Sequence, residues 1–90
     1  MPTVRVPTQL RTLTSGQGEV HVEGATIGEV LKALDAAHAG FAERIFDDSG
    51  SLRRFVNVFL DDEDVRFLDG LDTPVSPSQT VSIIPAVAGG

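Results

Sequence analysis

The chain has 90 residues, contains no cysteine and carries a formal net charge of -6 at pH 7. Its length and its 41% share of apolar residues allow one domain with a modest core, while the lack of cysteine excludes a disulfide framework, a thiolate metal site and a catalytic thiol. The acidic balance argues against a nucleic-acid surface and favours docking on basic patches of partner proteins. No membrane-length apolar segment and no signal-peptide pattern occurs, so we expect a cytoplasmic protein that does not bind membranes.

Two short segments near the N-terminus alternate apolar and polar residues as strands do. Thr3–Thr8 places Val4 and Val6 on one face, and Glu19–Glu23 repeats the pattern with two further valines. Thr14–Gly18, rich in serine and glycine, supplies a turn between them. These segments predict an N-terminal hairpin.

A helix is predicted from Ile27 to about Ala39, with Gly40 ending it. Thr26 and Glu29 fit a capping box, in which both side chains bond backbone N–H groups at the start of the helix. Apolar residues recur at helical spacing and form a stripe that would pack on a sheet. The stripe consists of Ile27, Val30, Leu31, Leu34 and Ala37.

The second half of the chain predicts a helical turn, a loop and further strands. Phe41–Phe46 suits a helical turn that leads into the loop Asp47–Ser51. Phe55–Leu60 has apolar residues on both faces, which is typical of a central strand. Asp61–Glu63 makes a tight connection into Asp64–Leu68.

The last strand is predicted at Thr80–Ile84. It follows a loop marked by Gly70, Pro74 and Pro77, and Pro85 ends it. The strand is long enough to pair with the first strand in the centre of a sheet.

This order of elements predicts an α+β, ubiquitin-like β-grasp domain over residues 1–85. Four to five strands would form a mixed sheet, and one helix would cover one of its faces. The sheet residues expected to be buried beneath the helix are Val4, Val6, Val56, Val58, Val81 and Ile83.

A flexible tail of small residues, Ala86–Gly90, is expected to project beyond Pro85 and ends in two glycines. Fully extended, it spans at most about 17 Å, which is enough to enter a narrow channel in another protein. A carboxylate on Gly90 could be adenylated with ATP and converted by sulfur into a thiocarboxylate, so a sulfur protein of this kind would need no cysteine. The alternative is an ordinary frayed terminus.

Three segments carry a resemblance to a known family: Arg53–Val58, Asp62–Phe67 and Ile84–Gly90. Through them the whole chain resembles the ThiS/MoaD sulfur carriers of thiamin and molybdopterin biosynthesis, and within that family the cysteine-biosynthesis (CysO) branch. Ala86, where molybdopterin carriers often have proline, agrees with that branch. Pro77–Gln79 departs from the family, because an acidic turn is common before the last strand.

The resemblance implies a carrier that is not itself an enzyme and that binds no cofactor or metal. Gly90 would be adenylated by an E1-like (MoeB/ThiF-like) enzyme that uses ATP, and a sulfurtransferase would supply the sulfur. The acceptor would be a synthase of the cysteine, thiazole or thiosugar type, and a metalloprotease could release the product. The residues that would thread into a partner's active site are Pro85, Ala86, Val87, Ala88 and Gly89.

An exposed apolar patch is predicted beside the tail. Phe55 and Phe59 lie on the strand face opposite the buried valines, and Ile84 would join them. Such a patch indicates a docking surface for the activating enzyme. The alternative is that Phe41–Leu52 folds over these side chains and buries them.

Other candidate sites have simpler interpretations. The acidic group Asp61–Asp64 lacks the spacing of a calcium loop and is interpreted as a solvated turn. His21 and His38 have no neighbouring nucleophile or carboxylate pattern, so we expect neither to be catalytic.

Two other functions stay open. A ubiquitin-like modifier would be joined through Gly90 to lysines of target proteins, although Lys32, the single lysine, leaves little for building chains. A plain β-grasp interaction domain would keep its function without the two terminal glycines.

Overall fold

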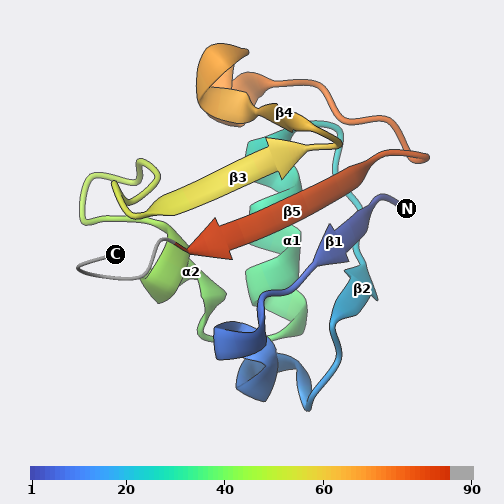
Figure 1. Ribbon diagram of the computed structural model, residues 1–90, viewed down its shortest axis with the longest axis vertical. Helices are drawn as coiled ribbons and strands as arrows, with labels where there is room; N and C mark the ends of the chain where they lie inside the picture. The colour runs from blue at the N-terminus through green and yellow to red at the C-terminus, as the bar shows by residue number, and fades with distance from the viewer. Residues whose placement is uncertain (86–90) are drawn as a thin grey trace.

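A five-stranded mixed sheet with helix α1 packed on one face forms the body of the molecule in a computed structural model that describes residues 1–85 (Figure 1). The strand order is β2-β1-β5-β3-β4, with β1 and β5 parallel in the centre and the other pairs antiparallel. The predicted β-grasp arrangement and the central pairing of first and last strands are confirmed. The strands are β1 (Thr3–Arg5), β2 (Glu19–His21), β3 (Val56–Leu60), β4 (Glu63–Asp64) and β5 (Thr80–Pro85).

The connection between β1 and β2 differs from the predicted turn. It contains a 3-10 helix, η1 (Thr8–Thr14), whose Leu10 and Thr14 side chains are buried. Pro7 precedes this helix and has no backbone N–H, so it cannot donate to a ladder, and the first strand ends earlier than predicted. The turn proper is shorter and follows η1 at Ser15, which has a φ of 56°.

Helix α1 (Ile27–Ala37) begins where the sequence predicts. The Thr26 hydroxyl accepts a hydrogen bond from Glu29 N at 3.2 Å, and a Glu29 carboxylate oxygen accepts one from Ala25 N at 3.3 Å. The first bond satisfies a backbone donor that the first turn of a helix leaves without a partner, and the second ties the residue before the cap to that turn.

The end of α1 corrects the prediction by about two residues. His38 occupies the C-terminal cap position, and Gly40, with a φ of 110°, lies instead at the start of α2 (Phe41–Ile45). Asp35 joins the two helices, because its Oδ1 accepts hydrogen bonds from Gly40 N at 3.2 Å and Ala42 N at 2.9 Å. The predicted helical turn at Phe41–Phe46 is therefore confirmed as a short helix.

The core lies between α1 and the sheet. All six sheet residues predicted to be buried are at most 6% exposed, and Ile27, Val30, Leu31 and Leu34 of the helical stripe are 0% exposed. Ala37 is exposed, because the helix ends there. Phe41 and Ile45 of α2 complete the core from the side.

The segment after β3 forms less strand than its sequence suggests. Only Glu63–Asp64 pairs with β3, and the chain then turns into the 3-10 helices η2 (Val65–Phe67) and η3 (Gly70–Asp72). At the other end, β5 includes Pro85, which pairs with Val56, so the strand is one residue longer than predicted.

The acidic connection at Asp61 is a tight turn, as predicted. Asp61 has a φ of 54°, and its carboxylate accepts hydrogen bonds from Thr80 N at 3.0 Å and from Gln79 Nε2 at 3.1 Å. Gln79 Oε1 in turn accepts a bond from Ser76 N at 2.9 Å. Gln79 thus builds the turn that departs from the family pattern.

Candidate functional site around the C-terminal end of strand β5

The central strand β5 fixes where the chain leaves the sheet. It is held by β1 on one side and β3 on the other, and its last pair is Pro85 with Val56. The ladder with β1 ends at Ser82, whereas the ladder with β3 continues to Pro85, so the point where the tail starts is still part of the sheet. The predicted threaded segment from Ala86 to Gly89 and the acyl site at Gly90 lie outside the described residues.

The face of the sheet away from α1 carries the predicted apolar patch. Phe55 is 64% exposed and Ile84 is 48% exposed, while Phe59 is half-buried. Phe41–Leu52 does not cover them, because its Phe46 and Leu52 pack against the core. Phe55 and Ile84 are therefore open to a partner, which is a geometric condition for the docking role.

Arg66 adds a polar side chain to this patch, a position that the sequence pattern did not predict. Its guanidinium donates to Asn57 Oδ1 at 2.8 Å and to the Arg53 carbonyl at 2.7 Å. Asn57 pairs with Ile84 across β3 and β5, so Arg66 lies beside the exposed apolar residues. The signal in the sequence is the Asp64-x-Arg66 spacing, because Asp64 Oδ1 accepts from Arg66 N at 2.9 Å and caps η2.

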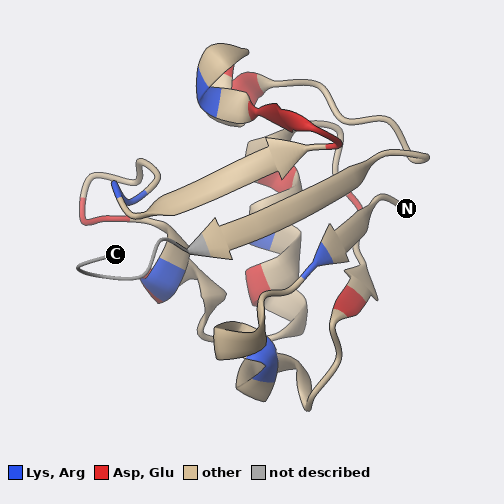
Figure 2. Cartoon of the chain, viewed as in Figure 1, with Lys and Arg blue, Asp and Glu red and all other residues tan. Residues whose placement is uncertain are grey.

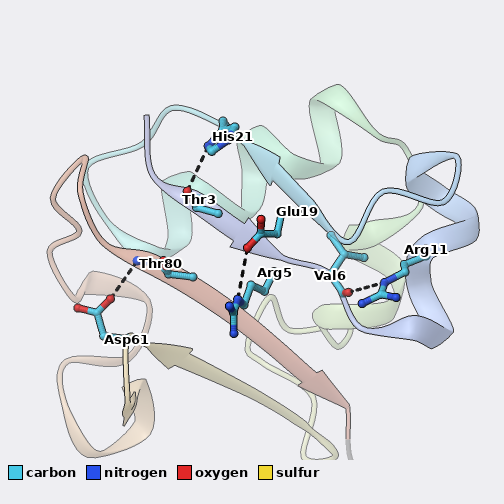
Figure 3. A network of polar contacts seen from close by, with 8 residues as sticks. All are labelled: Thr3, Arg5, Val6, Arg11, Glu19, His21, Asp61 and Thr80. Carbon is cyan, nitrogen blue, oxygen red and sulfur yellow. Dashed lines mark hydrogen bonds and ion pairs between the residues drawn. The ribbon is translucent and has the colours of Figure 1, made fainter.

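The same sheet face becomes polar toward β1 and β2. Arg5 and Glu19 form an exposed ion pair at 3.5 Å, and Thr3 Oγ1 lies 3.1 Å from His21 Nδ1 (Figure 3). Since these side chains satisfy one another, the apolar part of the open face is confined to β3 and β5. A shallow groove of about 320 Å³ runs beside Ile84 at the border of the two parts.

The remaining candidate residues lie apart from this site. His38 caps the end of α1, and His21 contacts Thr3 on the far edge of the sheet. Within residues 1–85, no three His, Cys, Asp or Glu side chains come close enough together to hold a metal ion. No helix in that part of the chain is both long and apolar enough to cross a membrane.

The loop before β3 contains a carboxylate with a lowered pKa. Hydrogen bonds from the Ser49 hydroxyl, at 2.6 Å, and from the backbone N–H groups of Ser49 and Ser51 lower the pKa of Asp47 below its ordinary value, and the charge of Arg53 acts in the same direction. These bonds favour the ionised form. They shape the loop that leads to Arg53 and Phe55.

Comparisons with known proteins agree on one family. The sequence pattern of the ThiS family matches residues 4–90. The chain is 49% identical over 90 residues to the sulfur carrier protein CysO of Mycobacterium tuberculosis, covering 98% of this chain and 97% of that protein.

One solved structure and one protein with a different name are also similar to this chain. The fold superimposes on a chain of the Amycolatopsis orientalis BexX/CysO complex with a TM-score of 0.93 and 44% identity, covering 100% of both chains. Small archaeal modifier protein 3 of Haloferax volcanii is 40% identical over 68 residues, covering 76% of this chain and 73% of that protein.

Proposed function

This chain belongs to the ThiS family and is a sulfur carrier, and we propose that it holds sulfur as a thiocarboxylate on the C-terminal carbonyl of Gly90. The observation that carries the proposal is the family match through residue 90 together with 49% identity to CysO over nearly the full chain. The tail follows a strand that pairs with β3 up to Pro85, so the fold can present it at a fixed place on the molecule.

The Gly90 carboxylate is a poor acyl donor, so it must first be activated. The Gly90 carboxylate attacks the α-phosphorus of ATP, pyrophosphate leaves, and the acyl adenylate so formed has a good leaving group. A hydrosulfide equivalent from a sulfurtransferase then displaces AMP and leaves a thiocarboxylate. This main-chain sulfur requires no cysteine, in agreement with the composition.

The carrier acts as a substrate of other enzymes in the cytoplasm. An E1-like enzyme of the MoeB/ThiF type performs the adenylation with ATP. A synthase that makes cysteine, a thiazole or a thiosugar accepts the sulfur. If the product becomes covalently attached to the carrier, a metalloprotease releases it. Phe55, Phe59 and Ile84 form the docking face, since two of them are exposed beside the point where the tail begins.

Mass spectrometry of the intact protein tests the acyl site. After incubation with ATP, an activating enzyme from the same genome and a sulfur source, the chain should gain about 16 Da, the difference between sulfur and oxygen, at its C-terminus. A chain without Gly89 and Gly90 is the control and should gain nothing. If the truncated chain gained the same mass, or the full chain gained none with any such enzyme, the proposal would be rejected.

A second function is favoured by the similarity to small archaeal modifier protein 3. A modifier would form an isopeptide bond from Gly90 to lysines of target proteins. Cell extract would then contain a ladder of conjugates that disappears when Gly90 is deleted. The CysO relatives match more of this chain, so sulfur delivery is the main proposal.

A further inference from the structure

Arginines gather where the tail leaves the sheet. Val56 pairs with Pro85, so Arg53 and Arg54 come directly before the strand that borders the end of β5. Arg53 is also tied to α2, because its N–H donates to the Ile45 carbonyl at 2.8 Å. Figure 2 shows positive positions on α2 and in the loop before β3, acidic positions elsewhere in the same loop, and further acidic positions on β4 and its turn. Of the seven cationic residues, those on the segments that meet here are Arg44, Arg53, Arg54 and Arg66.

Of the acidic residues in the same region, Asp47 and Asp64 are engaged within the molecule, whereas Glu43 and Asp48 are exposed. Asp47 Oδ1 accepts hydrogen bonds from Ser49 and Ser51, and Asp64 Oδ1 accepts one from Arg66 N. These two carboxylates therefore stabilise a turn and a cap, and they are less available to a partner than Glu43 and Asp48. The guanidinium groups contact neutral oxygens instead, since Arg66 donates to an amide and a carbonyl oxygen.

Arg54 has the least internal role of these arginines. It is exposed, and its side chain makes no hydrogen bond or ion pair with any residue between 1 and 85, whereas Arg5 is paired with Glu19 at 3.5 Å. It directly precedes Phe55, which is 64% exposed. A positive group beside an apolar side chain is suited to a partner surface that offers a carboxylate next to an apolar pocket.

We propose that the activating enzyme docks an acidic surface on the arginines around the end of β5, although the chain as a whole is acidic. Charges farther apart than about 8 Å are largely screened at physiological salt, so Arg54, exposed directly beside Phe55, acts on a partner seated on that side chain more strongly than the net charge of the chain does. This inference rests on the proposed function and differs from the sequence-based expectation of basic partner patches, which stays a prediction.

Two charge reversals of equal size test the inference. Arg54→Glu changes the sign beside the tail, and Lys32→Glu makes the same change in net charge on the outer side of α1, where Lys32 is exposed. The measurement is ATP–pyrophosphate exchange by the activating enzyme at about 0.15 M salt. We expect Arg54→Glu to raise the KM for the carrier on the order of tenfold with little change in kcat, and Lys32→Glu to leave it unchanged.

The outcomes separate this inference from the proposed function. Arg54→Lys keeps the positive charge, so its KM should match that of the wild-type protein. Circular dichroism should show that each variant is folded. If Arg54→Glu and Lys32→Glu changed the KM equally, or if Arg54→Glu lowered it, the inference would be overturned. The proposed function would stand as long as exchange still required Gly90. Exchange that persists without Gly89 and Gly90 would instead overturn the proposed function.

Discussion

The two faces of the sheet are built from the same strands, but they differ in what their side chains contact. On the α1 side, Val58 and Val81 are 0% exposed. On the other side, Ile84 of β5 and Phe55, just before β3, are about half or more exposed. Alternation along a strand places neighbouring residues on opposite faces, so stability and recognition can be assigned to different residues of one strand. Substitutions on the open face can therefore be made without removing the core.

The largest effect is expected on the buried face. Leu34→Ala removes a side chain that is 0% exposed on α1 and should lower the free energy of unfolding by about 3 kcal/mol. Phe55→Ala, on the open face, should lower it by less than about 1 kcal/mol. Urea unfolding followed by circular dichroism measures both. Similar losses for the two variants would show that the faces do not differ in their contribution to stability.

The next effect concerns binding and should appear on the open face. Phe55→Ala should reduce kcat/KM for adenylation on the order of tenfold, because an exposed aromatic side chain in a docking patch is a common anchor. The control is Thr12→Ala, an exposed position on η1. If Phe55→Ala is adenylated as efficiently as the Thr12→Ala protein, the docking face has been placed wrongly.

A smaller effect tests how the helix is fixed over the buried face. Thr26→Ala removes the hydroxyl that accepts from Glu29 N and should cost about 1 kcal/mol of stability. Thr26→Ser keeps an oxygen acceptor and should retain most of it. Thermal or urea unfolding that cannot distinguish the two variants would show that the cap contributes little here.

Much of the fold could be predicted because local patterns and tertiary packing agree. The capping pair Thr26 and Glu29 fixed the start of α1, and the apolar alternation on both faces of Phe55–Leu60 correctly indicated an inner strand. The 3-10 helix η1 was missed although Leu10 and Leu13 have helical spacing, because the glycines and serine that follow favoured a turn.

The site was only partly predictable for a different reason. The exposure of Phe55 and Ile84 follows from the alternation, whereas the role of Arg66 depends on the chain turning from β4 into η2, which brings its guanidinium to Asn57. The net charge likewise could not predict that arginines gather at one end of the sheet, because it does not say where in the fold each charged residue lies. Both features arise from tertiary structure.

The smallest expected effect depends on pH and lies in the loop leading to the docking face. The Ser49 hydroxyl and the neighbouring backbone donors lower the pKa of Asp47 in the folded state. The unfolded chain therefore binds the proton more readily, and the stabilisation is complete above the unfolded value of about 3.9 and is lost as pH falls through the folded pKa.

Asp47→Asn keeps one oxygen acceptor but cannot titrate, so the advantage of the wild-type protein over Asp47→Asn should be constant near neutral pH and shrink below about pH 4. NMR titration of the Asp47 carboxyl group gives the pKa directly, and Ser49→Ala should raise it because the first cause of the shift is removed. An advantage that grows toward acid would mean that the hydrogen bonds to Asp47 favour its protonated form. In that case packing, and not the charge of Asp47, would hold the loop that leads through Arg53 to the open face.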